Sequence, residues 1–238
     1  MKTKLYFAIA VLLTWFSSQA QNYTFSRVAS CPEPLYAPSY FSIGDSVFAI
    51  AGVVGNTNTN PKSLTSSVWL YNTRTDTWTQ KADFPGMRVY GASGFSIGSY
   101  GYVVNGWDSS GTDTGPADLW RYDPSTDTWA QKAPFPGSTR YTCTVFTLNN
   151  KAYIACGFKP YVNDMFSYDP ATDTWTQKAS FPGAPRQAMV YFTIGNTAYA
   201  GMGVTEGSPI GYTQSDWFKY DDVANTWTQL GNFPGDPL

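Results

Sequence analysis

The 238-residue sequence contains no histidine, and this absence removes several functional classes. Histidine is the side chain that most often moves protons near neutral pH, and its imidazole is the commonest metal ligand. A serine or cysteine nucleophile has no histidine to activate it, so a catalytic triad is excluded. A phosphate-binding glycine-rich loop and a correctly spaced calcium-binding acidic run are also missing. The sequence therefore predicts no cofactor and no metal.

Charged residues are scarce, at 13% of the sequence, and the 15 basic and 17 acidic side chains nearly balance. Because no segment concentrates lysine and arginine, nucleic acid is not expected as a partner. Helical periodicity is weak throughout. Aromatic residues are abundant, at 17%, and glycine and proline are frequent. Short strands separated by dense turn signals fit this composition, so the predicted fold class is all-β.

The first 20 residues have the layout of a secretory signal peptide. Lys2 and Lys4 precede an apolar stretch over residues 5–16, and Ser18 to Ala20 resemble a small-residue cleavage site. A retained membrane anchor is the alternative, but about twelve apolar residues are too few to span a bilayer comfortably. No other segment is apolar enough to span. We expect a secreted protein, either extracellular, periplasmic or at the cell surface.

Four anchors recur in fixed order through the rest of the chain. A phenylalanine opens each unit, a tyrosine ends a later strand, a tryptophan follows a turn, and a Phe-Pro-Gly step closes the unit. The tryptophans are 51, 46 and 52 residues apart. A period near 50 with four strands per unit is typical of a β-propeller. The anchors are Phe41, Phe95, Phe146 and Phe192; Tyr71, Tyr122, Tyr168 and Tyr220; Trp78, Trp129, Trp175 and Trp227; Phe84, Phe135, Phe181 and Phe233.

This set of motifs resembles the kelch repeat over essentially all of residues 21–238. The matches include a strand-end glycine, the Tyr-Asp pair, the tryptophan about six residues later, and an arginine that opens the next repeat. One departure is that the first residue of the usual glycine pair is Ala51, Asn105, Cys156 or Met202. The resemblance implies a kelch-type propeller with a closing strand at 21–34 and blades at 35–86, 87–137, 138–183 and 184–238.

The two ends of the chain do not match each other. Residues 22–32 align with an outermost fourth strand, with Phe25 in the place of Trp78 and Cys31 in that of Phe84. Such a strand normally completes the last blade, yet the last repeat already has its own fourth strand. We therefore expect four complete four-stranded blades plus an N-terminal closing strand, within an incomplete six- or seven-bladed propeller. The alternative is a closed four-bladed propeller with a loose N-terminal strand.

Cys143 and Cys156 flank a hairpin whose two-residue turn is Asn149-Asn150. Counting back from that turn places the cysteines opposite each other in a non-hydrogen-bonded pair, with α-carbons about 4.5 Å apart. This spacing lies just within disulfide range, and secretion permits oxidation. A Cys143–Cys156 disulfide is the expectation, and two buried thiols are the alternative.

A ligand is expected on the face that carries the variable loops between the second and third strands of each blade. Trp107 and Tyr161 have the side chains to stack on a sugar ring, or they cover loop backbone. The repeat-opening arginines either grip an acidic ligand or bond to neighbouring loops. The candidate ligand-binding residues are Arg88, Arg140, Arg186, Trp107, Asp108, Tyr161 and Glu206.

These observations leave three functional hypotheses. The first is a secreted binding module for protein or glycan. The second is an enzyme that resembles the kelch-fold N-acetylneuraminate epimerases, with Glu206 as acid–base residue and Arg140 or Arg186 holding the carboxylate. The third is a purely structural propeller. Galactose oxidase is another kelch-like propeller, but its copper needs histidine ligands, so its activity does not carry over.

Overall fold

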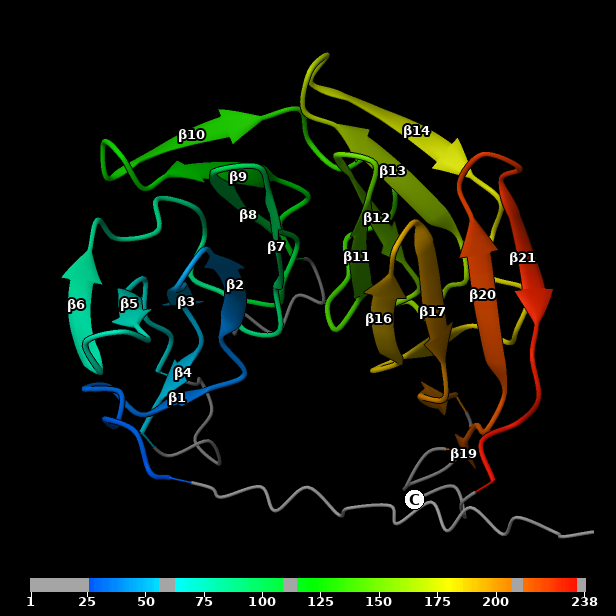
Figure 1. Ribbon diagram of the computed structural model, residues 1–238, viewed down its shortest axis with the longest axis horizontal. Coiled ribbons are helices and arrows are strands. Elements are labelled where there is room, and N and C mark those ends of the chain that lie inside the picture. The colour runs from blue at the N-terminus through cyan, green and yellow to red at the C-terminus, as the bar shows by residue number, and fades with distance from the viewer. Residues whose placement is uncertain (1–25, 56–62, 109–114, 207–211, 235–238) are drawn as a thin grey trace, which may run out of the picture.

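The computed structural model describes residues 26–55, 63–108, 115–206 and 212–234, and it contains strands and turns with no helix in those ranges. Four antiparallel sheets of four strands stand around a common axis, and the first strand of each lies nearest that axis (Figure 1). This arrangement confirms the predicted all-β propeller with four four-stranded blades. The signal-peptide residues lie outside the described ranges.

Each blade runs outward from the axis in sequence order. Blade 1 contains β2 (Ser39–Ile43), β3 (Ser46–Ile50), β5 (Val68–Asn72) and β6 (Thr77–Lys81), and blade 2 contains β7 (Ser93–Ile97), β8 (Tyr100–Val104), β9 (Leu119–Asp123) and β10 (Thr128–Lys132). Blade 3 contains β11 (Thr144–Leu148), β12 (Lys151–Ala155), β13 (Met165–Asp169) and β14 (Thr174–Lys178), and blade 4 contains β16 (Val190–Ile194), β17 (Thr197–Gly201), β20 (Trp217–Asp221) and β21 (Thr226–Gln229). Two small sheets join β1 (Leu35–Tyr36) to β4 (Val53–Val54), and β15 (Arg186–Gln187) to β18 (Val204–Thr205) and β19 (Tyr212–Thr213).

Two-residue turns close the inner hairpin of every blade. In blade 3, Leu148 pairs with Lys151 as the sequence predicts, and Asn149 and Asn150 both have positive φ, at 49° and 58°. That combination is the type I′ turn, whose twist matches the twist of the flanking strands. These hairpins fix the register of the strands that line the axis.

The faces of neighbouring blades pack through aromatic rings. The strand-end tyrosines of blades 2, 3 and 4 (Tyr122, Tyr168 and Tyr220) are wholly buried. The phenylalanine of each of the first three Phe-Pro-Gly steps meets the next blade's tryptophan edge to face, with centroids 5.3 Å apart for Phe84 and Trp129. Phe135 with Trp175 and Phe181 with Trp227 repeat this contact at 5.2 and 5.3 Å. The recurring aromatic residues therefore form the interface between blades.

A repeated pair of hydrogen bonds, here called the junction latch, joins each blade to the next. Directly after the outermost strand of blade 1, the Ala82 N–H donates to Asp127 Oδ1 of blade 2 at 3.0 Å. Trp129 Nε1 of blade 2 donates back to the Ala82 carbonyl at 3.1 Å. Ala133 makes the same pair with Asp173 and Trp175, and Ala179 makes it with Asn225 and Trp227. Both backbone polar groups of one alanine are thus satisfied by the following blade.

The acceptor of the latch occupies a turn position that few residues tolerate. Asp76, Asp127, Asp173 and Asn225 have φ between 52° and 55°, the left-handed region in which Asp and Asn are enriched. Each also accepts a hydrogen bond from its own blade's tyrosine hydroxyl, as Asp173 does from Tyr168 at 2.7 Å. The repeated turn, Asp-Thr in blades 1 to 3 and Asn-Thr in blade 4, is therefore structural in all four blades.

The N-terminal segment makes the same latch with blade 1. The Ala29 N–H donates to Asp76 Oδ1 at 2.7 Å, and Trp78 Nε1 donates to the Ala29 carbonyl at 2.9 Å. Ala29 is the residue that the sequence alignment places opposite Ala82. Residues 26–31 thus stand where the outer strand of a preceding blade would stand, although they join none of the sheets among the described residues.

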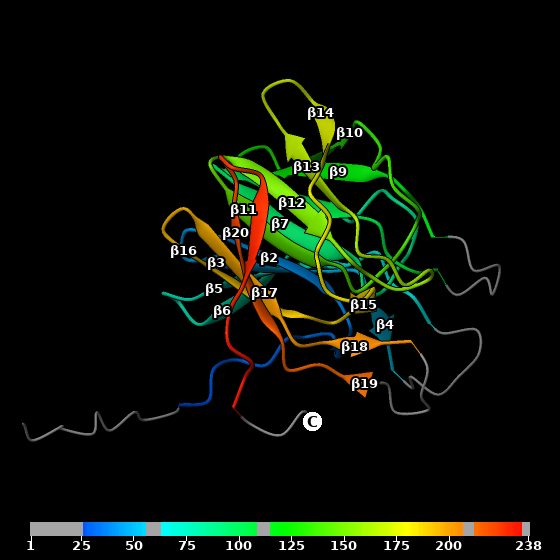
Figure 2. The same ribbon diagram turned by 90° about the vertical axis from the view of Figure 1, so that its right-hand side faces the viewer.

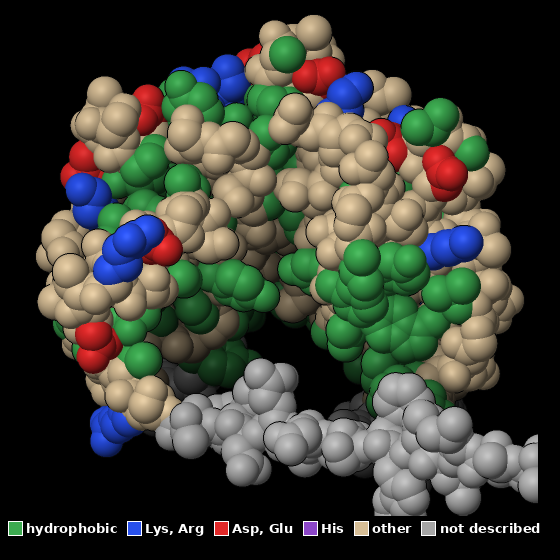
Figure 3. All heavy atoms as spheres, viewed as in Figure 1, with side chains coloured by type: hydrophobic (Ala, Val, Ile, Leu, Met, Phe, Trp, Pro, Cys, Tyr) green, Lys and Arg blue, Asp and Glu red, His purple; other side chains and the backbone are tan. Residues whose placement is uncertain are grey.

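The ring of blades is open between blade 4 and blade 1, which form the two ends of an arc (Figure 1). The first phenylalanines of blades 1 to 3 (Phe41, Phe95 and Phe146) are 4–5% exposed, whereas Phe192 of blade 4 is 45% exposed. Ile194 is 65% exposed on the same face. Figure 3 shows hydrophobic side chains gathered there, beside the central hollow. The expected total of six or seven blades stays a prediction.

The cysteine pair differs from the expected disulfide. Cross-strand pairing of β11 and β12 ends at Thr144 and Ala155, because Cys156 takes a left-handed backbone with φ of 58°. The regular geometry from which the disulfide was predicted therefore stops one residue short of Cys143 and Cys156. Both are buried free thiols in this structure, and Cys31 is a partly buried one. Burial raises the pKa of Cys143 to about 11 and that of Cys156 to about 12.

The open ring predicts unequal costs for one substitution at two equivalent positions. Phe146→Ala should lower the free energy of unfolding by about 3–5 kcal/mol, because it empties a closed interface. Phe192→Ala should cost about 1–2 kcal/mol, because its ring already contacts solvent. Urea unfolding of both variants measures the difference. Equal losses would mean that another element covers Phe192 in solution.

The junction latch predicts a loss of stability in acid. Desolvation raises the pKa of Asp127 and of Asp173, but hydrogen bonds from the latch and from tyrosine outweigh it, so both pKa values lie below the usual range. A carboxylate with a depressed folded-state pKa stabilises the fold above its unfolded pKa, and this contribution fades as pH falls through the folded value. The Asp127→Asn and Asp173→Asn double variant, which copies Asn225, should lose less stability than wild type between pH 7 and pH 3. Equal losses in denaturant titrations would contradict this prediction.

The buried thiols predict a specific pattern of reactivity. In native protein at pH 8, only Cys31 should react quickly with a chromogenic disulfide reagent, because Cys143 and Cys156 are inaccessible and protonated. After unfolding in denaturant without reductant, three thiols should react. A count of one thiol in the unfolded protein would instead establish the Cys143–Cys156 disulfide.

Candidate functional site

The loops between second and third strands share one face of the propeller with the crossings between blades. The small strands β4, β15, β18 and β19 lie on this side (Figure 2). We call it the loop face. It is the face on which the sequence predicts ligand binding.

Glycines fix the loop face to the blades beneath it. The Gly106 N–H donates to the Arg140 carbonyl, and the Gly157 N–H donates to the Arg186 carbonyl, so each second strand ends on the next blade's opening residue. Gly106 and Gly157 have φ of 117° and 124°, and a Cβ on Gly157 would stand 2.8 Å from Arg140 Cδ. Only glycine fits this close approach. The first loop residues, Trp107 and Phe158, are therefore held rigidly.

Arg140 and Arg186 lie inside their blades, where each side chain is wholly buried. Arg140 makes a two-pronged ion pair with Asp164 and donates to the carbonyls of Cys156 and Ser138. Arg186 repeats this pattern with Asp216 and with the carbonyls of Met202 and Ala184. Bidentate pairing with a carboxylate uses the geometry that suits guanidinium best. The structure gives both arginines the loop-bonding arrangement that the sequence left as an alternative to ligand binding.

Arg88 does not share that position. The carbonyl that accepts from the Gly52 N–H belongs to Val89, so Val89 is the equivalent of Arg140 and Arg186. Val89 is buried and Arg88 is exposed. Asp118, the counterpart of Asp164, accepts instead from Trp120 Nε1 at 2.5 Å. The three arginines therefore do not form a ring.

Five aromatic side chains form a continuous row on the loop face, here called the aromatic ladder. Tyr141 stands at its centre, with ring centroids 5.9 Å from Tyr90, 5.1 Å from Trp107 and 5.2 Å from Phe158. Phe158 continues the row to Tyr161 at 4.7 Å. Backbone bridges pair Tyr90 with Trp107 and Tyr141 with Phe158, so the row rests on main-chain hydrogen bonds from blades 2 and 3.

Polar groups border the aromatic ladder. The Lys159 ammonium lies 4.3 Å from the centroid of the Trp107 ring, a cation–π distance. Gln187 Nε2 donates to the Tyr161 hydroxyl at 3.2 Å, and Thr142 donates to Gln187 Oε1 at 2.7 Å. Trp107 is buried, while the other four rings are partly exposed. The arrangement is a firm, amphipathic surface with aromatic faces and hydrogen-bonding edges.

The two acidic candidates lie apart from the ladder's interactions. Asp108 follows Trp107 and is partly buried, and its Oδ1 is buried with no hydrogen-bond partner among the described atoms. Glu206 is exposed. Strand pairing brings Thr205 opposite Arg186, but the Arg186 guanidinium faces Asp216 inside the blade. Within the described ranges, no group of histidine, cysteine, aspartate or glutamate could hold a metal ion.

Sequence reasoning found Trp107 and Tyr161 but not Tyr90, Tyr141 and Phe158. Their positions in the repeat could have identified them. Tyr90 and Tyr141 each follow the residue that opens a blade, and Trp107 and Phe158 each follow a strand-end glycine. The equivalent pairs are Tyr36 with Val53 in blade 1 and Gln187 with Val204 in blade 4. Paired aromatic residues at this position are therefore confined to blades 2 and 3.

Comparison with known proteins agrees with this architecture. The family model described as the kelch motif matches residues 34–85 and 139–182. A solved structure titled "Structure of YjhT" matches with a TM-score of 0.72 and 18% sequence identity, over 88% of this chain and 69% of that one. At that identity the likeness shows the fold alone. No curated protein matches the sequence.

No helix among the described residues has the length and apolar character to cross a membrane.

Family-model matches in two of the four blades, the four-stranded radial sheets and the structural likeness all lead to one assignment. The chain is a kelch-repeat β-propeller.

Proposed function

We propose that this propeller is a secreted binding module that holds a protein or glycan ligand on its loop face, with the aromatic ladder at the centre of the contact. The observation that carries the proposal is the continuous row of five rings, four of them partly exposed and all fixed by the blades. Rigid aromatic side chains offer large contact area at low entropic cost, and they dominate binding energy at interfaces.

The charged groups support binding rather than catalysis. The buried Arg140 and Arg186 are each already paired with a carboxylate, so neither guanidinium is free to hold an acidic sugar. Glu206, the acid–base candidate of the epimerase hypothesis, is exposed and has no ion pair among the described residues. The N-terminal 20 residues support export, because their basic, apolar and small-residue segments follow the order of a signal peptide.

Substitution in the aromatic ladder tests the proposal. The purified protein is screened on glycan and peptide arrays, and the affinity of each hit is measured by surface plasmon resonance. Phe158→Ala and Tyr161→Ala should each weaken binding by about thirtyfold, the effect of losing one aromatic anchor worth about 2 kcal/mol.

Tyr36→Ala is the matched control, because Tyr36 is an exposed tyrosine of blade 1 outside the ladder. This variant should bind like wild type, and all three should unfold at similar denaturant concentrations. Hits that keep full affinity in both ladder variants would contradict the proposal, as would the absence of any hit on both arrays.

A further inference from the structure

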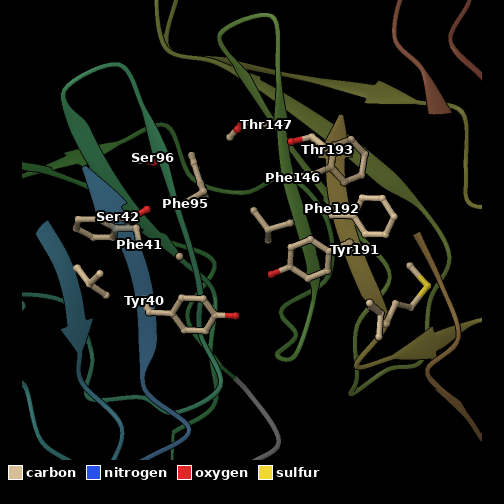
Figure 4. A pocket seen from close by; sticks show the side chains of 15 residues that line it. Tyr40, Phe41, Ser42, Phe95, Ser96, Phe146, Thr147, Tyr191, Phe192 and Thr193 are labelled. Atoms are coloured by element: carbon tan, nitrogen blue, oxygen red, sulfur yellow. The ribbon is translucent and has the colours of Figure 1, made fainter. Parts of the chain in front are cut away.

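A cavity of about 640 Å³ lies on the propeller axis, between the inner strands β2, β7, β11 and β16 (Figure 4). Ligand pockets in proteins commonly enclose roughly 300–1,000 Å³. This axial cavity is lined by strands rather than by loops, so the aromatic ladder does not contribute to it. It is a second concave surface with walls from all four blades.

The lining of the axial cavity contains no charged side chain. Besides two tyrosine hydroxyls, its polar side chains are serine and threonine hydroxyls at one equivalent position of each repeat, directly after the first phenylalanine of the blade. Among the described residues, no hydrogen bond to the side chains of these four is formed, so their donors and acceptors face the cavity unused. The residues are Ser42, Ser96, Thr147 and Thr193.

Two tyrosines stand on opposite walls, one residue before the phenylalanines of blades 1 and 4. Figure 4 shows the hydroxyls of Tyr40 and Tyr191 directed toward the space between them. The same position holds Gly94 in blade 2 and the buried Val145 in blade 3, so only blades 1 and 4 place an aromatic ring there. Gly94 is required, because a Cβ there would stand 2.3 Å from the Tyr40 carbonyl oxygen.

We propose that the axial cavity is a binding site for a neutral saccharide of one or two sugar units. A ring of hydroxyls that both donate and accept matches the alternating donors and acceptors of a sugar's own hydroxyl groups. The phenol rings of Tyr40 and Tyr191 supply faces for the apolar C–H surface of a pyranose. A charged ligand would lose hydration on entry and find no opposite charge, which disfavours acidic sugars.

Titration calorimetry with cellobiose, maltose and lactose, each at up to about 50 mM, tests this site on the full chain, since millimolar affinity corresponds to only about 4 kcal/mol. At least one of the three should bind, and glucuronic acid should bind more weakly. Thr147→Val with Ser96→Ala removes two wall hydroxyls at nearly constant shape. This pair should weaken binding by about tenfold to a hundredfold, as each lost hydrogen bond costs roughly threefold to tenfold.

Thr176→Val is the matched control, because Thr176 is exposed on the outer strand β14. It should bind saccharide like wild type. Absence of binding by all three neutral sugars, or tighter binding of glucuronic acid, would overturn the proposal. So would affinity that survives the double variant but is lost in Tyr161→Ala, which would place the sugar on the aromatic ladder and leave the proposed function standing.

Discussion

The junction latch is the constraint on which the rest of this structure depends. A blade presents one alanine directly after its outermost strand, and the next blade satisfies both the N–H and the carbonyl of that alanine. Unsatisfied backbone groups at a buried interface are costly, so this pair of bonds fixes how neighbouring blades meet. Each blade packs against its neighbours, as in other repeat proteins, and the latch repeats with distances of 2.7–3.1 Å at all four junctions. The tyrosine, tryptophan and aspartate of each repeat must therefore keep their positions relative to one another.

This structural use of polar residues determines where function can lie. The latch aspartates are occupied by tyrosine and backbone donors, and the two buried arginines are occupied by Asp164 and Asp216. The positions left for ligand recognition are those that the contacts between blades do not constrain. These are the aromatic residues beside the strand-end glycines and the hydroxyls on the axial strands. Both surfaces are neutral or nearly so, which suits contact through stacking and hydrogen bonds more than through charge.

The sequence predicted the four blades well because the residues that join neighbouring blades recur as a repeated sequence motif. Tyr122, Trp129 and Phe135 reappear with the same spacing, and spacing is visible without coordinates. The sequence predicted individual positions less well wherever an offset of one residue changes which residues of two blades are equivalent. Arg88 stands one place before Val89, and only the backbone bond from Gly52 shows that Val89 is the equivalent of Arg140. The cysteine pair shows a similar difficulty, since the left-handed backbone at Cys156 ends the regular strand pairing from which the disulfide was predicted.

The latch also limits what can pack between the two ends of the arc. Blade 4 offers an apolar face there, with Phe192 and Ile194 exposed. On the other side, Ala29 already occupies Asp76 and Trp78 of blade 1. A complete blade, such as blade 4 of a second copy, carries its own outer strand and would compete with residues 26–31 for those two side chains. A sheet that supplies three strands and leaves the outermost place to residues 26–31 meets no such competition. Closure of this ring by an incomplete blade is therefore favoured over closure by a complete one.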